Sequence, residues 1–292
     1  MLEDGKWSGP IIDQHIHLDR NNRFLEAIGD FTISGGTAIN LVHKPDFAKL
    51  PVTLEQYKEV YHNTLEMADE VRDKCDIDVS VILGPHPVAW EKQISSLGIE
   101  EATKLHLDAV DLALEYISDG FAVCLGEVGR PHYPVDDRTW EWANKTLMQI
   151  MEKAAFEKVS IQLHVEDNGE KTYSNLSDMC EKSGMPRERA IRHYAPADIS
   201  PEFRHGISST VSVGKGSIAK IIETLSDSSP IWGMETDFMD DERRPGAVLG
   251  PKTVPRRTQQ LCQELWVSDY SDNKITTLMK NIHSKWPKEI YS

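Results

Sequence analysis

The sequence predicts a single-domain α/β fold, a TIM-like (β/α)8 barrel of eight strand–helix units that is either regular or distorted. Short apolar runs rich in β-branched residues alternate along the chain with longer stretches of helical spacing. Parallel strands need a crossover helix between them, so this alternation indicates a parallel sheet. Eight such units suggest closure into a barrel. The alternative, an open doubly wound sheet, lacks its glycine-rich phosphate loop, because HIHLDR follows the first strand instead.

Eight runs have the composition and length of barrel strands. They are residues 10–18, 37–44, 78–87, 122–129, 159–166, 190–195, 206–214 and 231–238. Helical spacing between strands is clearest at 53–74, 99–117 and 138–156. The last part, 255–286, also has helical spacing and is expected to pack on the outside of the barrel.

Length and composition favour one globular unit over residues 1–292. The 292 residues are 39% hydrophobic and 27% charged, with no composition break that would mark a second domain. The N-terminus has no apolar signal core and no apolar run approaches ~20 residues, so we expect no membrane partner. The four cysteines form no Cys-x-x-Cys pair, which favours separate reduced thiols in a cytoplasmic protein.

The net charge is acidic, with 32 basic against 47 acidic residues and a formal charge of −15. A uniformly acidic surface does not attract nucleic acid through counterion release. A nuclease is still compatible with it, because a local basic rim and metal ions can hold phosphates. Tight non-specific DNA binding is therefore not expected.

Two histidines in IIDQHIHLD are the first candidate metal ligands. His15 and His17 are two residues apart on a predicted strand, so their side chains point to the same face. In a barrel that face is the interior, where two imidazoles make poor core and good ligands. Taken alone, they fit buried, hydrogen-bonded core histidines equally well.

Four further ligand-type residues end later predicted strands. They are Glu127 in CLGEVG, His164 in IQLHVED, His193 in IRHYA and Asp237 in METDF. The C-terminal ends of the strands are where a barrel carries its active site. The register of all six therefore argues against the core reading and for a metal centre.

The ligand chemistry predicts two ions. One would be held by His15, His17 and Asp237, a second by His164 and His193, with Glu127 bridging them. Mixed imidazole and carboxylate ligation suits zinc, manganese, iron or cobalt better than calcium. Two such ions, about 3.5–4 Å apart, polarise a substrate oxygen and activate water.

These residues resemble the amidohydrolase superfamily and, within it, the TatD-type hydrolases, often called TatD deoxyribonucleases. Four segments carry the resemblance: IIDQHIHLD (11–19), GPHP (84–87), GEVG (126–129) and METD (234–237). It spans roughly residues 11–240. Phosphotriesterase and urease relatives have a carbamylated lysine where this chain has Glu127, which favours the TatD branch.

The resemblance implies a metal-dependent hydrolase with one or two divalent ions, which we expect to be zinc, manganese, magnesium or cobalt. It implies hydrolysis of phosphodiesters at a nucleic-acid end, so a deoxyribonuclease activity. The six residues match the family's ligands one by one. Asp237 would also take the proton from the attacking water, and Glu127 would be the second catalytic carboxylate.

The sequence departs from the family pattern at two places that concern substrate contacts. An acidic residue commonly follows the strand 4 motif, whereas this chain has Arg130. An arginine often follows the strand 5 histidine, whereas here His164 precedes Val165, Glu166 and Asp167. We predict His86, Arg130 and His132 as substrate-binding residues, each with a structural role as the alternative.

Two other features surround the predicted site. The stretch 240–257 is rich in proline, glycine and charge, and is expected to form a long loop on the C-terminal face. Its Arg243, Arg244, Arg256 and Arg257 form a basic cluster that either contacts a nucleic-acid backbone or pairs with its own acidic neighbours. His62, His106 and His283 fall in helical stretches and are expected on the surface.

Three functions remain open from the sequence. The first is a phosphodiesterase acting on nucleic-acid ends. The second is a hydrolase of a small amide, lactone or ester, favoured by the acidic chain and the two departures. The third is a barrel that binds metal without catalysis, although the ligand set leaves room for water, unlike a closed structural site. The partner is thus a small-molecule or nucleic-acid-end substrate, and the oligomeric state stays open.

Overall fold

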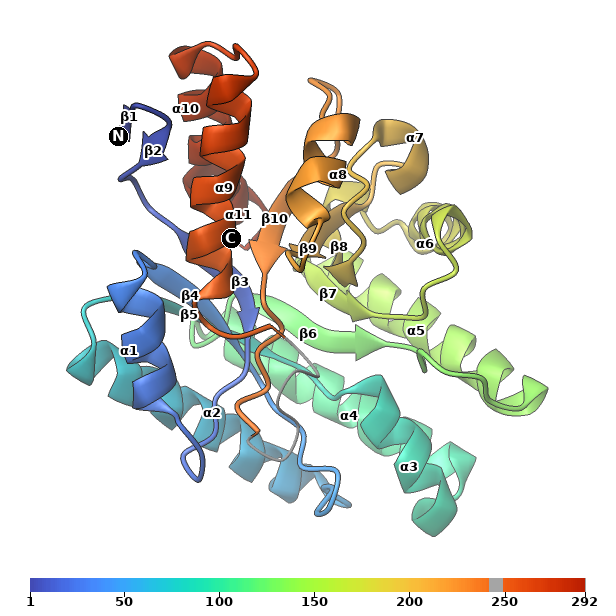
Figure 1. Ribbon diagram of the computed structural model, residues 1–292. Helices are drawn as coiled ribbons and strands as arrows, with labels where there is room; N and C mark the ends of the chain where they lie inside the picture. The colour runs from blue at the N-terminus through green and yellow to red at the C-terminus, as the bar shows by residue number, and fades with distance from the viewer. Residues whose placement is uncertain (242–248, 292) are drawn as a thin grey trace.

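Eight parallel strands form the centre of the molecule in the computed structural model, which describes residues 1–241 and 249–291 (Figure 1). The strands are β3 (Ile12–Ile16), β4 (Ala38–Val42), β5 (Asp78–Leu83), β6 (Cys124–Gly129), β7 (Ile161–His164), β8 (Ala190–Ala195), β9 (Ser208–Ser212) and β10 (Trp232–Glu235). Each lies inside one of the eight predicted runs, so the strand predictions are confirmed.

The sheet closes into a barrel. Each strand pairs in parallel with its neighbour in the sequence from β3 to β10. The two ends join through a parallel bridge between Ile16 and Phe238. Here the His17 amide donates to the Phe238 carbonyl at 2.8 Å and the Asp237 amide donates to the His15 carbonyl at 3.0 Å. The (β/α)8 prediction is confirmed, and the seam of the barrel runs through the predicted ligands.

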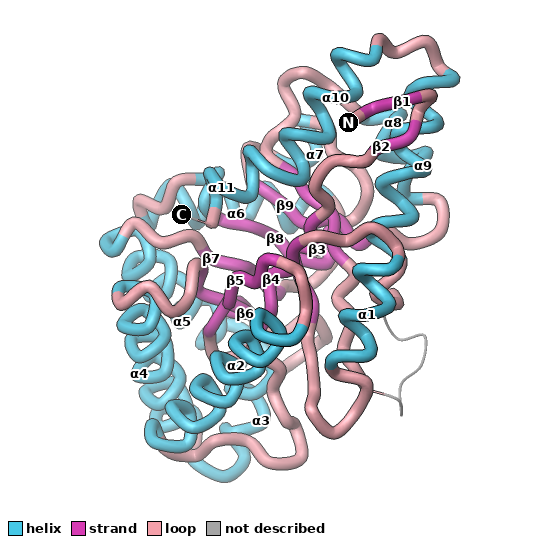
Figure 2. Tube along the Cα trace, turned by 90° about the vertical axis from the view of Figure 1, so that its left-hand side faces the viewer, coloured by secondary structure: helices cyan, strands magenta, loops and turns pink. Residues whose placement is uncertain are grey.

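Helices surround the strands, as the tube in Figure 2 shows. They are α1 (Leu25–Ile33), α2 (Leu54–Lys74), α3 (Pro87–Leu97), α4 (Ile99–Ser118), α5 (Asp137–Glu157), α6 (Glu170–Ser183), α7 (Pro201–Arg204), α8 (Ser217–Thr224), α9 (Thr253–Val267), α10 (Asp272–Lys280) and α11 (Trp286–Ile290). A short 3-10 turn spans Arg187–Arg189, and a π-helical turn spans Asn281–Lys285. None of the helices in the described ranges is long and apolar enough to cross a membrane.

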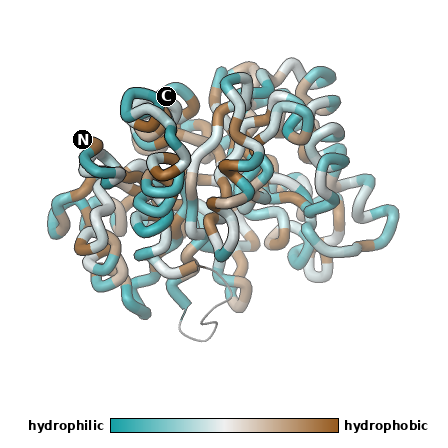
Figure 3. The backbone as a smooth tube through the Cα atoms, turned by 45° about the horizontal axis from the view of Figure 1, so that its top comes forward, coloured by the Kyte–Doolittle hydropathy of each residue, from teal (hydrophilic) through white to brown (hydrophobic). Residues whose placement is uncertain are grey.

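Local sequence explains where the long helices begin. The Thr53 side chain accepts the Gln56 amide at the start of α2, and Asp136 accepts the Thr139 amide at the start of α5. Such N-caps satisfy amides that have no partner inside the helix. Apolar side chains then recur every third or fourth residue, as Leu105, Ala109 and Ala113 do in α4, and are buried against the barrel. Figure 3 shows the matching alternation of brown and teal along the helices.

The end of the chain returns to the barrel. The helices α9 to α11 and the π turn occupy the predicted helical region 255–286, and a short antiparallel hairpin, β1 (Leu2–Glu3) and β2 (Lys6–Trp7), reaches α9. Trp7 exchanges hydrogen bonds with the Gln259 side chain at 3.0 and 2.7 Å. All four cysteines are free thiols, as expected.

Two histidines expected on the surface are buried. His106 in α4 and His283 in the π turn are almost fully enclosed, whereas His62 is exposed as predicted. The prediction was wrong for His283 because the last helices fold back against the barrel: its ring accepts the Ile12 amide at 3.3 Å and meets the Thr258 hydroxyl at 3.1 Å. His106 lies on the buried face of α4, between Ala102 and Val110, so the spacing of these apolar residues already indicated its burial.

Part of the basic stretch 240–257 lies outside the described residues, Arg243 and Arg244 included. Arg256 and Arg257 belong to the beginning of α9 rather than to a loop. Arg256 is exposed, and Arg257 donates to the Val213 carbonyl at 3.1 Å. The contact of this cluster with a nucleic-acid backbone stays a prediction.

Candidate metal centre

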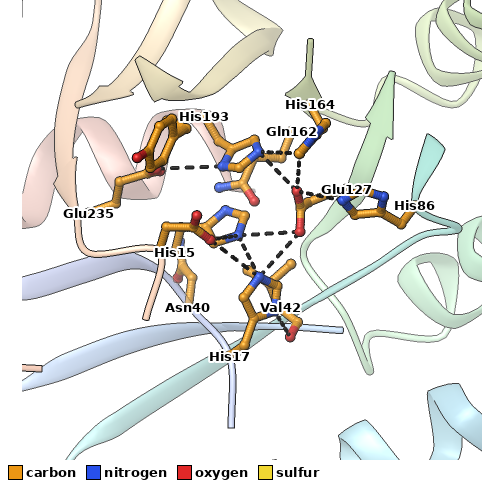
Figure 4. Close-up of polar contacts among 12 residues, drawn as sticks. His15, His17, Asn40, Val42, His86, Glu127, Gln162, His164, His193 and Glu235 are labelled. Atoms are coloured by element: carbon orange, nitrogen blue, oxygen red, sulfur yellow. Dashed lines mark hydrogen bonds and ion pairs between the residues drawn. The ribbon is translucent and has the colours of Figure 1, made fainter. Parts of the chain in front are cut away.

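The six predicted ligands lie together at the C-terminal ends of the strands. Most are labelled in Figure 4, where the imidazoles surround Glu127. They come from β3 and the residue after it, β6, β7, β8 and the segment after β10: His15, His17, Glu127, His164, His193 and Asp237. His15, His17, Glu127 and His193 are buried, while His164 and Asp237 are partly exposed. The site is thus a buried cluster with an open side.

The first group of ligand atoms has the spacing of a four-coordinate metal site. The Nε2 atoms of His15 and His17 are 3.1 Å apart. Glu127 Oε1 lies 3.5 and 3.3 Å from these two atoms, and Asp237 Oδ1 lies 3.6 and 3.5 Å from them. A regular tetrahedron with metal–ligand distances of about 2.05 Å has edges of about 3.3 Å. His15, His17 and Asp237 therefore have the spacing of ligands to one divalent ion, and Glu127 Oε1 lies close to both imidazoles.

The second group gathers around the other oxygen of the same carboxylate. Glu127 Oε2 lies 2.8 Å from His164 Nδ1 and 2.9 Å from His193 Nε2. The two ring nitrogens are 3.0 Å apart. This group has three atoms where the first has four, so it leaves more of a coordination sphere to water or substrate. Glu127 thus presents one carboxylate oxygen to each group.

Partners on the far side of the rings fix which nitrogen is free to bind a metal. His17 Nδ1 lies 3.0 Å from the Val42 carbonyl, and His193 Nδ1 lies 3.5 Å from Glu235 Oε1. An acceptor at Nδ1 holds the proton there, because a neutral imidazole has one donor and one acceptor nitrogen. The Nε2 lone pair of His17 then faces the cluster, as metal ligation requires, whereas Glu235 faces His193 Nδ1 without a hydrogen bond.

His132 is the partner on the far side of the His164 ring, but in His164 the nitrogen that faces the cluster is Nδ1 rather than Nε2. Its Nδ1 lies 2.6 Å from His164 Nε2, so His164 presents Nδ1 to Glu127. His132 is exposed and lies next to the open side of the site. The structure therefore places this predicted substrate residue in contact with a predicted ligand. Its contact with substrate stays a prediction.

The charges of the cluster are strongly coupled. Burial alone would raise the pKa of Glu127, but the positive charge of His193 and hydrogen bonds from the histidines hold it well below its usual value. Burial alone would lower the pKa of His17, but Asp237 and Glu127 raise it to about 9. Burial lowers the pKa of His164 to about 3. The cluster thus places protonated imidazole next to ionised carboxylate. A metal ion bound here would take the place of the imidazole protons.

Two buried carboxylates that support the ligands were not identified from the sequence. Asp13 accepts the Thr236 amide at 3.1 Å, the Thr236 hydroxyl at 2.6 Å and the His15 amide at 3.2 Å. Burial raises its pKa to about 7. Glu235 accepts the Tyr194 amide at 2.6 Å and binds the Thr210 hydroxyl. Each precedes a ligand by two residues, the same spacing that drew attention to His15 and His17.

Arg130 lies apart from the metal cluster. Its guanidinium is buried and makes a two-point contact with Glu166, at 2.7 Å for both bonds. The amide oxygens of Asn144 and Asn175 accept from the same group at 2.6 and 2.7 Å, and the Trp140 ring lies 4.8 Å from it. Its predicted role in substrate binding stays a prediction, and most of its N–H groups already have acceptors within the protein.

A cavity of about 1010 Å³ opens beside the cluster. His86, the predicted substrate residue at the end of β5, forms part of its wall and has Nε2 3.5 Å from Glu127 Oε2. Apolar residues such as Phe47 and Met67 alternate with polar ones around the rest. Lys44 at the mouth is paired with Asp19 at 3.0 Å. The cavity has room for a small substrate or the end of a chain.

Known proteins share both the sequence pattern and the fold. Residues 12–282 match the family described as TatD related DNase. An uncharacterised protein of Methanocaldococcus jannaschii is 29% identical over 263 residues, which cover 87% of this chain and 88% of that protein.

Three solved structures share the fold at low identity. A TatD homologue from Escherichia coli has a TM-score of 0.60 at 16% identity, with 96% of this chain and 97% of that chain covered. A TatD-like protein from Archaeoglobus fulgidus has a TM-score of 0.53 at 15% identity, covering 91% and 99%. The phosphotriesterase homology protein of Escherichia coli has a TM-score of 0.58 at 10% identity, covering 100% of both.

The family match covers nearly the whole chain and includes every residue of the cluster. It agrees with the resemblance that the strand-end motifs carry. The chain therefore belongs to the TatD related DNase family and is a metal-dependent hydrolase.

Proposed function

We propose that the protein is a binuclear metal-dependent phosphodiesterase that acts on nucleic-acid ends. One observation carries the proposal: the two oxygens of Glu127 divide between two ligand groups, Oε1 toward His15 and His17 and Oε2 toward His164 and His193. Two ions held in this way polarise a phosphoryl oxygen and generate a nucleophile from water near neutral pH. The family match and the open side of the second group support the same reading.

In this mechanism Asp237 accepts the proton of the attacking water. Burial alone would raise the pKa of Asp237, but the hydrogen bond from His17 and the charges of the neighbouring histidines lower it. The carboxylate is thus ionised near neutral pH and ready to act as a base. Asp237 is partly exposed, so solvent can reach it.

Metal content tests whether the Glu127 carboxylate holds two ions. The protein, purified without chelator, should hold roughly two equivalents of transition metal. Glu127→Ala should lower this content, because each ligand group loses one oxygen. Glu115→Ala, which removes an exposed carboxylate from α4, is the matched control and should keep the wild-type content. A wild type that is metal-free and takes up no added zinc, manganese or cobalt would end the proposal.

Activity tests the substrate. End-labelled single-stranded DNA should be shortened from one end, and Asp237→Asn should lose this activity while Asp227→Asn, an exposed position, keeps it. Bis(p-nitrophenyl) phosphate serves as the minimal phosphodiester. A protein loaded with metal that leaves both substrates intact would exclude phosphodiester hydrolysis.

A second candidate is hydrolysis of a small lactone, ester or amide by the same centre. The observation that favours it is the pairing of two of the three basic residues that line the cavity: Lys44 binds Asp19, and Arg20 binds Glu70 at 3.2 Å, while Lys49 is exposed. Paired cations attract a polyanion less strongly than free ones. Turnover of lactones or aryl esters by a protein that is inert to DNA would select this candidate.

A further inference from the structure

The strand β8 has a bulge at the residue that follows the predicted ligand His193. Its register against β9 shifts between Arg192 and Ala195, where three steps along β8 match two along β9. Tyr194 lies in this bulge with a φ of +48°, in the left-handed region that bulky side chains rarely adopt. Bulges beside active sites re-aim side chains. The position of the Tyr194 ring is therefore set by an irregularity of the strand and not by its ordinary alternation.

The bulge leaves the Tyr194 side chain uncovered. In a regular strand Tyr194 would share a face with Arg192, two residues earlier. That face is covered, because Arg192 is buried with its guanidinium 4.7 Å from the centre of the Tyr173 ring on α6. Tyr194 is instead 51% exposed, and its ring centre lies 6.4 Å from that of His193. An aromatic ring is thus open to solvent beside the second ligand group.

Glu235 holds the backbone of Tyr194 and faces the ring of His193. Its Oε1 accepts the Tyr194 amide at 2.6 Å and lies 3.5 Å from His193 Nδ1. Figure 4 shows Glu235 beside His193 at the edge of the cluster. Burial, and then the negative charges of Asp237 and Glu235, raise the pKa of the Tyr194 hydroxyl, so the phenol lies within electrostatic reach of both carboxylates. The backbone that carries the exposed ring is therefore fixed at the margin of the metal cluster.

An exposed aromatic face beside a centre that is proposed to bind phosphate suits a nucleobase. Every base has a π face that stacks on an aromatic side chain, whatever the identity of the base. Stacking also supplies attraction that charge does not supply here, because the chain is formally −15 and both Lys44 and Arg20 in the cavity are paired. A phosphate at the metal cluster and a base on Tyr194 are two parts of one nucleotide.

We propose that Tyr194 is a specificity-determining residue, on whose ring the base next to the scissile phosphate stacks. This role rests on the proposed phosphodiesterase function and defines its substrate more closely, as an unpaired nucleic-acid end. A base inside a duplex has both faces covered by its neighbours, so only an unstacked base presents a face to the ring.

Nucleotide binding tests the stacking without turnover. The 5′- and 3′-monophosphates of 2-aminopurine deoxyriboside contain a base and a phosphate but no phosphodiester bond, and 2-aminopurine fluorescence is quenched when the base stacks. We expect quenching by the wild type in the presence of Zn²⁺. Tyr194→Leu should bind roughly 5- to 150-fold more weakly and without quenching, as for loss of one base–aromatic stack. Tyr194→Phe retains the ring and should retain binding and quenching. Phe156→Leu, at an exposed position on α5, is the matched control.

Hydrolysis provides the second readout. The wild type should cleave a single-stranded DNA end that carries bases faster than the same end with abasic sites, and Tyr194→Leu should lose this preference. The loss should appear in KM rather than in kcat, because stacking stabilises the bound substrate and the transition state alike. A merely structural side chain predicts that both ends are cleaved more slowly with the preference intact, and that result would overturn the proposal.

Other results would also decide against Tyr194 as a stacking residue. One is wild-type quenching by Tyr194→Leu. Another is a Tyr194→Phe variant that behaves like Tyr194→Leu, because the hydroxyl rather than the ring would then be the contact. Lower metal content or melting temperature in Tyr194→Leu would assign Tyr194 to holding His193 instead.

The two readouts separate the stacking from the proposed function. If the wild type leaves phosphodiesters intact but quenches 2-aminopurine through Tyr194, the proposed function fails and the stacking stands. If the wild type cleaves DNA ends with and without bases equally well, the proposed function stands and the stacking fails.

Discussion

Arg130 and Glu166, which are 36 residues apart in the sequence, form a two-point ion pair that lines a pocket apart from the metal centre. Both belong to segments that depart from the expected TatD-type pattern, Arg130 directly after the GEVG motif and Glu166 in the stretch after His164. The pair links the segment after β6 to the segment after β7, and so connects the strands that carry Glu127 and His164.

Breaking this pair should destabilise the protein. Glu166→Gln leaves the Arg130 guanidinium, which is 2% exposed, with only neutral partners. An unpaired buried charge costs about 3–5 kcal/mol, and we expect a loss near the lower end because Asn144 and Asn175 remain. Urea unfolding monitored by circular dichroism measures the change.

The charge-reversed double variant provides the stricter test. Arg130→Glu combined with Glu166→Arg should recover part of the stability lost by either single change. Glu141→Gln breaks the exposed Glu141–Lys145 pair and should change little. Strictly additive losses in the double variant would show that the two side chains do not depend on each other.

Glu235 should control metal affinity through His193. Glu235→Gln removes the charge that faces His193 Nδ1 at 3.5 Å and orients the ring. Loss of such a supporting carboxylate lowers metal affinity by roughly 10- to 100-fold. Competition with a chromophoric chelator measures this, with Glu223→Gln, an exposed position on α8, as the control. Unchanged affinity would mean that backbone contacts alone position His193.

Gly129 should be irreplaceable beside His164. Its φ is +151°, and a Cβ there would lie 2.0 Å from the His164 carbonyl oxygen. Gly129→Ala must therefore displace the end of β7 and weaken the second ligand group. Gly120→Ala has a positive φ of +81° but open space around its Cβ, so it carries backbone strain without displacement. We expect metal content to fall only in the first variant.

Acid should destabilise the protein partly through His283. Burial lowers its pKa to about 3, whereas the unfolded chain has the ordinary value of 6.5. Between these values the unfolded state binds more protons, so stability is full above pH 6.5 and declines as the pH falls toward 3, by at most about 1.4 kcal/mol per pH unit. His283→Gln should reduce this dependence of the free energy of unfolding on pH, whereas His62→Gln, at an exposed position, should leave it unchanged. Urea unfolding at a series of pH values measures the free energy.

If the stability of His283→Gln and His62→Gln falls equally steeply with decreasing pH, groups other than His283 cause the acid sensitivity. His106 is one alternative, because burial also lowers its pKa to about 3. The two buried histidines are distinguished by making His106→Gln alongside His283→Gln.

The sequence by itself determined the fold class, the strand positions and the residues that gather at the site. Strand alternation and the placement of ligand-type side chains at strand ends are local features, and barrel closure brings all such ends to one rim. That is why His15, His17, Glu127, His164, His193 and Asp237 were identified without coordinates. The supporting carboxylates Asp13 and Glu235 had the same spacing but no distinguishing chemistry in the sequence.

Only the tertiary structure decided how these residues are used. The division of the Glu127 oxygens, the pairing of Arg130 with Glu166 and the burial of His283 all depend on contacts between distant segments. The same holds for the partner of each imidazole, a carbonyl at His17 but an amide at His86. Strand-end position is a property of the local sequence, whereas a tautomer or an ion pair is set by atoms that only the folded chain brings within hydrogen-bonding distance.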